Sequence, residues 1–338
     1  MLYFVSTQLS LCYLAFAFLS ALGALQAVAA RYRIVGLAFV DYSDHPWRGY
    51  ILGAVLALAG GLTFFVTQWE MIFTPGPAGA ELTILFGAAA LAAVLVTFLL
   101  ASLLHCGRPS PQGAVPGDGH SVAVGRSKAH LYIPSESTAP LAAVCLLPGC
   151  ADSRLTALAN RLSRQGLVAL VLEFDPQAFA PPAMHEVVPA AVELLSKLPL
   201  VDAQRLGILG HDLGGDLAIR AAASDTRIRA VAALAPVLDQ TAPGLSLLQE
   251  MPFPSALRWV SASARTVACK ELAAREHAPS VAPRPFLLVY GEWDALVSSP
   301  SGSEHTAQRM DIPGARHMDL PENLTVQQTV AEWFKEHL

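Results

Sequence analysis

The first 105 residues contain three long apolar runs, at residues 2–30, 50–68 and 82–104. A helix needs about 20 predominantly apolar residues to cross the hydrocarbon core of a bilayer, and each run is near or above that length. No Lys, Arg, Asp or Glu lies in the middle of any run. Because intramembrane ionisable groups mark most ion and proton pathways, the runs predict membrane anchors and argue against a transporter.

Two other interpretations of these runs are open. The first run could be a cleaved signal peptide, but it has no basic n-region, its apolar core is long and two further runs follow it. The second run is the shortest and contains Gly60 and Gly61, so it could be a buried core helix. Aromatic residues at its two ends, Trp47, Tyr50 and Trp69, instead favour a membrane span.

The basic residues near the runs predict the orientation. Arg31, Arg33 and Arg48 lie between the first two runs, and the connection at 69–81 has no Lys or Arg. Basic residues return after the third run, at positions 108, 126 and 128. By the positive-inside rule, we expect a multi-pass integral membrane protein with an outside N-terminus and a cytoplasmic C-terminal domain.

Composition excludes several classes of protein. Only 14% of the residues are charged, against about 25% in an ordinary soluble domain, and 53% are hydrophobic. The net charge of -5 and the lack of a basic stripe exclude a strong nucleic-acid binder. The five cysteines form no C-x-x-C pair and the histidines show no metal-ligand spacing, so we expect neither a metal nor a cofactor. The sequence does not predict the oligomeric state.

The second part of the chain alternates between apolar strands and helices. A Gly-, Pro- and Ser-rich linker at 105–120 separates it from the membrane domain at 1–104. Strands are predicted at 122–124, 129–133, 142–147, 168–174, 206–209, 228–235 and 286–290. Helices are predicted at 153–165, 187–197, 213–223, 301–310 and 322–336. This order predicts an α/β domain at 121–338, with a mostly parallel sheet covered by helices on both faces.

The strongest local motif is Gly-His-Asp-Leu-Gly at 210–214, between a predicted strand and a predicted helix. The pattern Gly-x-nucleophile-x-Gly is a nucleophile elbow, a tight turn that presents its central side chain above the sheet. Here the central residue is Asp212. The alternatives are a tight turn without chemistry and a dinucleotide-binding loop, but the glycine spacing does not give G-x-G-x-x-G.

Two further residues follow the elbow in the chain order that triads of this kind use, nucleophile, acid and histidine. Asp294 lies in the segment Gly-Glu-Trp-Asp at 291–294, which follows the predicted strand at 286–290, and His317 lies in a predicted loop before the last helix. Taken singly, each has a simpler interpretation, Asp294 as a turn residue or helix cap and His317 as a surface histidine. Together with the elbow, they predict a triad of Asp212, Asp294 and His317.

From about residue 121 to 338 the chain resembles an α/β-hydrolase, specifically the dienelactone hydrolase, chlorophyllase and cutinase-like polyesterase branch. Leu-Pro-Gly-Cys-Ala at 147–151 resembles the oxyanion loop of those esterases, and the segment 202–207 leads into the elbow as theirs does. The resemblance implies that Asp294 orients His317, that His317 is the base, and that the backbone N–H groups of Cys150 and Leu213 form the oxyanion hole.

Asp212 departs from this branch, which has Ser or Cys at the elbow. It is similar to haloalkane dehalogenases and epoxide hydrolases, in which an Asp in a G-H-D-x-G sequence forms an alkyl ester that water then hydrolyses. Their other groups are not evident. The segment 240–282 has no Tyr to protonate an epoxide oxygen, and Leu213 stands where dehalogenases carry a halide-binding Trp. Trp259 and Trp293 are candidate substitutes.

The apolar segment at about 240–282 is interpreted as a small lid over the pocket. A helical excursion packed on the core and a contact with the bilayer surface are the alternatives. We therefore expect a membrane-anchored hydrolase that acts on a lipophilic ester-like or alkyl substrate. The alternative is a catalytically inactive hydrolase fold that serves as a ligand-binding or interaction module at the membrane, since Asp212 is unusual in an esterase-like frame.

Overall fold

The computed structural model describes residues 2–32, 34, 37–39, 45–69, 79–106, 119–125, 127–135, 140–149, 155–173, 181–236, 274–297 and 307–338. These residues fall into two compact units, one formed before residue 109 and one formed by most of the chain after it. The predicted linker lies mostly outside the described residues. The predicted lid at about 240–282 also lies mostly outside them, since residues 237–273 are not among the described residues.

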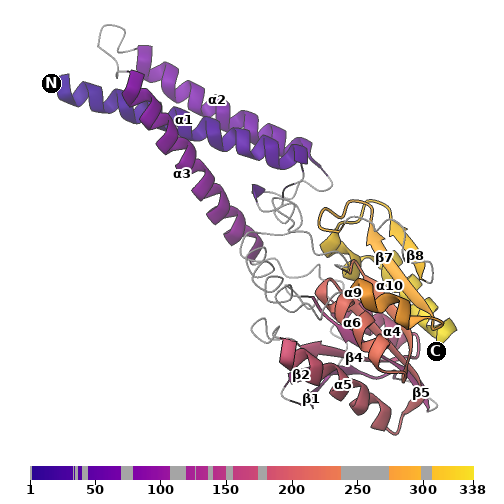
Figure 1. Cartoon of the computed structure of the whole chain (residues 1–338). Helices are drawn as coiled ribbons and strands as arrows, with labels where there is room; N and C mark the ends of the chain where they lie inside the picture. The colour runs from indigo at the N-terminus through magenta and orange to yellow at the C-terminus, as the bar shows by residue number, and fades with distance from the viewer. Residues whose placement is uncertain are drawn as a thin grey trace. The chain divides into compact units, whose positions relative to one another are not determined.

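The first unit consists of three long helices, α1 (Leu2–Tyr32), α2 (Trp47–Trp69) and α3 (Gly79–Cys106). Helix α1 packs against both α2 and α3, as Figure 1 shows. By length and composition each helix could span a membrane, over Ser10–Tyr32, Trp47–Val66 and Glu81–Ala101, with mean hydropathies of 1.9, 2.0 and 2.6. Many of their large apolar side chains are exposed, among them Leu58, Phe65 and Ile84. This is the surface expected of helices that face lipid.

Helices α1 and α2 approach closely at two glycines. A Cβ atom at Gly23 would lie 2.5 Å from the carbonyl oxygen of Gly53, and one at Gly53 would lie 2.7 Å from the carbonyl oxygen of Gly23. Small residues allow transmembrane helix backbones to come together in this way. Further along the pair, the rings of Phe16 and Phe64 are in contact, with centroids 5.1 Å apart.

Eight strands of the described residues form one sheet in the second unit, in the order β1-β2-β4-β3-β5-β6-β7-β8. Strand β2 pairs antiparallel with both β1 and β4, and the other pairs are parallel. The strands are β1 (His120–Val124), β2 (Ser127–Tyr132), β3 (Leu141–Leu147), β4 (Val168–Glu173), β5 (Val201–His211), β6 (Ile228–Leu234), β7 (Phe286–Gly291) and β8 (Gln308–Ile312). The sheet is therefore mostly parallel, as predicted.

Helices pack on both faces of this sheet. The helical elements are α4 (Leu155–Arg164), α5 (Pro181–Lys197), α6 (Leu213–Ser224), α9 (Ala274–His277), η3 (Ala278–Val281), η4 (His317–Glu322) and α10 (Leu324–His337). Leu158 of α4 and Phe334 of α10 share one apolar cluster with alternate strand residues such as Leu146 and Leu209. The intervening residues, such as Cys145 and Ile208, are equally buried but lie outside that cluster. Because side chains alternate along a strand, these residues face the layer of α5 and α6.

Several sequence predictions differ from the structure; for example, α5 begins at Pro181, whereas the sequence predicted a helix from 187. Residues 308–310 were expected in a helix but belong to the edge strand β8, so that prediction is wrong for the part of 301–310 that the structure describes. Strand β5 (Val201–His211) is longer than the predicted 206–209 at both ends, because it also includes residues 201–205 and 210–211. His317 was placed in a loop and instead begins the short helix η4.

Candidate active site

Asp212 lies at a sharp turn between β5 and α6. Its backbone has φ 56° and ψ −128°, a conformation that non-glycine residues rarely adopt and that strains the backbone. Two hydrogen bonds hold the turn: the N–H of Asp212 donates to the carbonyl oxygen of Leu234 at 3.0 Å, and the N–H of Gly215 donates to the carbonyl oxygen of Asp212 at 2.8 Å. This is the geometry of a nucleophile elbow.

The glycines on either side of Asp212 are required by space. A Cβ atom at Gly210 would lie 1.9 Å from the carbonyl oxygen of Gly214. One at Gly214 would lie 2.2 Å from the carbonyl oxygen of Leu147 at the end of β3. Because both obstacles are backbone atoms, the turn closes only with glycine at these two positions, which explains the Gly-x-Asp-x-Gly pattern.

Asp294 lies in the turn after β7, where its carboxylate is fixed by the backbone. The N–H of Asp294 donates to the carbonyl oxygen of Gly291 at 3.1 Å. Its Oδ1 atom accepts the backbone N–H groups of Leu296 and Val297, each at 2.9 Å. Two N–H donors on one oxygen orient the carboxylate and leave its other oxygen free to face a partner.

His317 lies between Asp212 and Asp294. Its Nδ1 atom is 2.9 Å from Oδ2 of Asp294, and its Nε2 atom is 3.4 Å from Oδ1 of Asp212. The three side chains are almost completely buried, at 0% exposure for His317, 1% for Asp294 and 3% for Asp212. The structure therefore brings together the three residues of the predicted triad, although they come from separate parts of the chain: the β5–α6 turn, the turn after β7 and the start of η4.

A network of backbone contacts, which the sequence did not reveal, joins the Asp294 turn to the segment before His317. The N–H of Glu292 donates to the carbonyl oxygen of Ile312 at 3.0 Å, and the N–H of Trp293 donates to that of Ala315 at 2.9 Å. In return the N–H of Gly314 donates to Oε2 of Glu292 at 2.9 Å. These contacts depend on β8, which aligns the two segments, so missing this strand in the sequence also hid the network.

The pKa of His317 is raised well above its ordinary value. Complete burial acts to lower it, but the charges of Asp294 and Asp212 and their hydrogen bonds to the ring outweigh that effect. A neutral neighbour, His211, lies beside it. The Nε2 atom of His211 is 3.0 Å from the carbonyl oxygen of His317, and burial, followed by repulsion from His317, lowers the pKa of His211 to about 4. His211 therefore donates an N–H to the backbone of His317.

Of the two predicted oxyanion donors, Leu213 and Cys150, the structure describes only Leu213. Leu213 is the first residue of α6, so its N–H belongs to the first turn of the helix, where N–H groups have no acceptor within the helix. Cys150 lies outside the described residues. Gly149, directly before it, borders the site, because a Cβ atom there would lie 2.7 Å from both Cβ and Oδ2 of Asp212. The chain segment that leads to Cys150 is therefore in contact with the Asp212 side chain.

The remaining candidate residues from the sequence are Trp259 and Trp293. Trp259 lies outside the described residues, and the exposed ring of Trp293 lies against Gly314, at a distance of 3.7 Å from a Cβ atom built there. Among the described residues, no cluster of His, Cys, Asp and Glu side chains could hold a metal ion. The absence of a cofactor remains a prediction.

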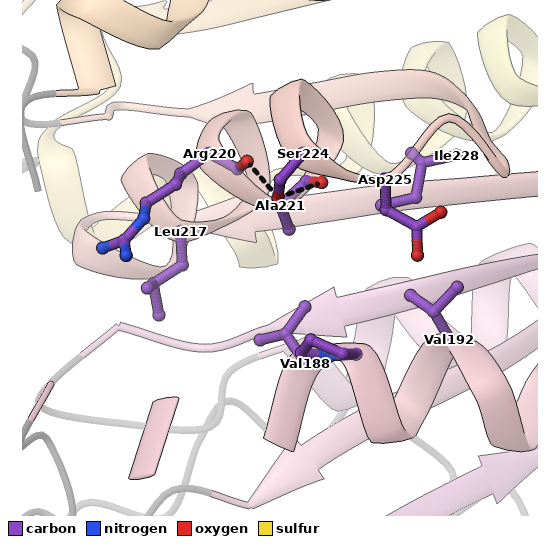
Figure 2. A pocket seen from close by; sticks show the side chains of 9 residues that line it. Val188, Val192, Leu217, Arg220, Ala221, Ser224, Asp225 and Ile228 are labelled. Atoms are coloured by element: carbon purple, nitrogen blue, oxygen red, sulfur yellow. Dashed lines mark hydrogen bonds between the residues drawn. The ribbon is translucent and has the colours of Figure 1, made fainter. Parts of the chain in front are cut away.

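A groove lies between α5 and α6. Figure 2 shows Val188 and Val192 on one side of it and Leu217 and Arg220 on the other. None of the triad residues lines this groove.

The sheet order, the elbow and the acid and histidine turns together define an α/β-hydrolase fold. The profile of the PET hydrolase-like (PETase) family matches residues 113–247, a segment that includes the elbow. A comparison with curated protein sequences found no match.

Several solved structures are similar to part of this chain. A thermostable esterase from Pseudomonas putida is 18% identical, with a TM-score of 0.52 over 65% of this chain and 82% of that chain. Est1E from Butyrivibrio proteoclasticus is 16% identical, with a TM-score of 0.48 over 65% and 98% of the two chains. An esterase from Pyrobaculum calidifontis is 16% identical, with a TM-score of 0.47 over 64% and 84%. The likeness to the Pseudomonas putida esterase, whose TM-score is 0.52, concerns the fold alone at this low identity, and it supports the α/β-hydrolase part of the predicted fold class. The narrower branch of the superfamily stays a prediction.

Proposed function

We propose that this protein is a hydrolase, held in a membrane by α1, α2 and α3, that attacks a lipophilic ester-like or alkyl substrate with the carboxylate of Asp212. One observation carries the proposal: the imidazole of His317 lies within 3.4 Å of Asp212 on one side and 2.9 Å of Asp294 on the other. A nucleophile, a histidine and an orienting acid in this order form a hydrolytic triad.

The carboxylate has two routes, and both end in hydrolysis. At an sp³ carbon it displaces the leaving group and forms an alkyl ester, which water cleaves with His317 as base. At an acyl carbon it displaces an alcohol and forms a mixed anhydride, which water cleaves in the same way. The N–H groups of Leu213 and Cys150 would stabilise the oxyanion that forms in the second route.

The domain organisation supports a substrate that partitions into lipid. In this proposal residues 1–104 are the membrane domain, 105–120 the linker and 121–338 the catalytic domain, with a lid at about 240–282. By the positive-inside rule, the basic residues Arg31, Arg33 and Arg48 favour a cytoplasmic catalytic domain. A catalytic domain tethered at a bilayer meets dissolved lipophilic substrates at high local concentration.

The test is substrate profiling of the full-length protein in lipid vesicles. The panel contains neutral esters of graded acyl length, haloalkanes and epoxides. We expect turnover that is abolished by Asp212→Asn and by His317→Gln but kept by Asp311→Asn, which makes the same change at a half-exposed acid of β8. If no compound is turned over, or if turnover survives both triad substitutions, the proposal fails. In the first case the alternative, an inactive ligand-binding module, would gain support.

A further inference from the structure

The triad contains one imidazole between two carboxylates, and this arrangement determines where its proton lies. Both ring nitrogens of His317 face a carboxylate oxygen, Nδ1 that of Asp294 and Nε2 that of Asp212. An ionised carboxylate only accepts hydrogen bonds, and a neutral imidazole donates from one nitrogen only. With both acids ionised, a neutral ring would therefore point a lone pair at a negative oxygen.

The alternative, a neutral ring beside a protonated carboxyl group, has the same net charge. Burial favours the second state, which carries one charge instead of three, but the attraction of the two carboxylates for the ring opposes burial and raises the pKa of His317 well above its ordinary value. The ordinary pKa of an imidazole is about 6.5 and that of an Asp carboxyl about 3.9. Within the described part of the chain, a third titratable group faces the ring: His211, whose ring centroid is 5.2 Å away and which is neutral at physiological pH.

We propose, building on the proposed function, that His317 is an imidazolium in the resting enzyme and acts first as an acid, donating its Nε2 proton to an oxygen leaving group. The site then selects esters over haloalkanes. In a serine triad the histidine begins neutral and collects the proton of the serine hydroxyl. The carboxylate of Asp212 has no proton to give, so its histidine can protonate a leaving group only if it starts out charged.

The steps balance. In the first step a carboxylate oxygen of Asp212 bonds to the acyl carbon of the ester, the bond from that carbon to the alkoxy oxygen breaks, and the alkoxy oxygen takes the Nε2 proton. An alcohol leaves, His317 is neutral, and Asp212 carries a mixed anhydride. In the second step neutral His317 takes a proton from water, the resulting hydroxide cleaves the anhydride, and the acid product leaves the Asp212 carboxylate and the His317 imidazolium restored.

The consequence for substrate class follows from the leaving group. An alkoxide is a poor leaving group unless it is protonated, so an alkyl ester gains the full benefit of the acid. A halide leaves without a proton and gains nothing from it. A resting imidazolium beside Asp212 is thus useful for esters and not for haloalkanes.

The test compares two esters with the same acyl group, one with an alkyl alcohol and one with p-nitrophenol as leaving group, using the full-length protein in detergent micelles. Because kcat/KM reports the free enzyme, we expect it to fall for the alkyl ester as pH rises through the elevated pKa of His317, by about tenfold per pH unit. His317→Gln should lose at least about 10²-fold more activity with the alkyl ester than with the nitrophenyl ester.

A value of kcat/KM for the alkyl ester that instead rises with pH through the neutral range would show that a neutral histidine starts the reaction, and would overturn this inference alone. Equal losses with both esters in His317→Gln would overturn it too. Failure to turn over any ester would overturn both this inference and the proposed function.

A second measurement reports the charge state of the His317 ring in the absence of substrate. In protein labelled with ¹⁵N-histidine, the ring signals of His317 are assigned by their disappearance in His317→Gln. We expect imidazolium shifts for His317 at neutral pH in the wild type and a lowered pKa in Asp212→Asn, which removes one of the two negative charges. Neutral-imidazole shifts in the wild type at neutral pH would contradict the inference.

Discussion

The carboxylate of Asp294 divides its two oxygens between the backbone and His317. Its Oδ1 atom accepts two backbone N–H groups, and its Oδ2 atom lies 2.9 Å from Nδ1 of His317. The oxygen that faces the ring therefore cannot turn away without breaking two hydrogen bonds. Asp294 fixes both the ring position and the proton on Nδ1, which leaves Nε2 facing Asp212.

Replacement of Asp294 by Asn should lower the catalytic rate without changing the stability of the fold. The amide oxygen of Asn still accepts the N–H groups of Leu296 and Val297, so the turn survives. Its NH₂ group then faces Nδ1 of His317 as a donor, which forces the wrong tautomer and removes a negative charge. We expect kcat to fall by about 10³–10⁴-fold with the melting temperature nearly unchanged. A variant that keeps more than a tenth of the wild-type kcat would show that Asp294 does not orient the ring.

The elbow glycines should tolerate no side chain. Gly210→Ala would place a Cβ atom 1.9 Å from a carbonyl oxygen, and we expect a loss of at least about 3 kcal/mol in the free energy of unfolding, together with loss of activity. Gly215→Ala is the matched control on the same turn, since its Cβ atom would lie 3.1 Å from a side-chain atom of Pro236. We expect a change within about 1 kcal/mol there, because alanine also favours the helix. Denaturant unfolding measures both, and equal losses would contradict the steric explanation.

The free energy of unfolding should depend on pH through the protonation of His211. Its pKa is about 4 in the folded protein, against about 6.5 when unfolded. As pH falls from about 6.5 to about 4, the unfolded state binds a proton that the folded state does not, so the free energy of unfolding decreases. Between about pH 7 and about pH 4 the wild type should lose about 3 kcal/mol more than His211→Gln. The check is denaturant unfolding followed by Trp fluorescence at each pH, and parallel curves for the two proteins would refute the assignment.

The contact between α1 and α2 should be sensitive to a single methyl group. Gly53→Ala would place a Cβ atom 2.7 Å from the carbonyl oxygen of Gly23, whereas Gly61→Ala, on the same helix, would meet nothing within 4 Å. We expect Gly53→Ala to destabilise the helix pair by about 1–3 kcal/mol and Gly61→Ala to leave it unchanged. Thermal unfolding of the two variants in the same detergent measures the difference. If both variants unfold like the wild type, the two helices do not meet at these glycines.

The sequence predicted the buried parts of the fold better than its edges. Buried parallel strands such as β3 and β4 are continuous apolar runs, and both were predicted within one residue of their observed ends. Strand β8 was mistaken for helix because it lies at the edge of the sheet and its residues Gln308, Arg309 and Asp311 are polar. What identifies β8 as a strand is its pairing with β7. This pairing is a tertiary contact, so the local sequence of β8 does not reveal it.

The residues of the candidate site were predictable because they leave patterns in the sequence. The elbow glycines leave a local pattern, and the order of nucleophile, acid and histidine along the chain survives in the sequence. The distances among Asp212, Asp294 and His317, and the hydrogen bond from Gly314 to Glu292, depend on tertiary contacts that no spacing reveals. The oxyanion role of Cys150 and the lid at about 240–282 remain predictions.

The most direct test of the account is to look for a covalent bond to Asp212. The full-length protein is mixed with excess ester, quenched with acid during turnover and digested, and the peptides are weighed by mass spectrometry. We predict that the peptide containing Asp212 carries the acyl fragment, or a hydroxamate when hydroxylamine is present, and that the same peptide of Asp212→Asn carries neither. Steady turnover with an unmodified Asp212 peptide under both conditions would contradict the claim that this carboxylate is the nucleophile.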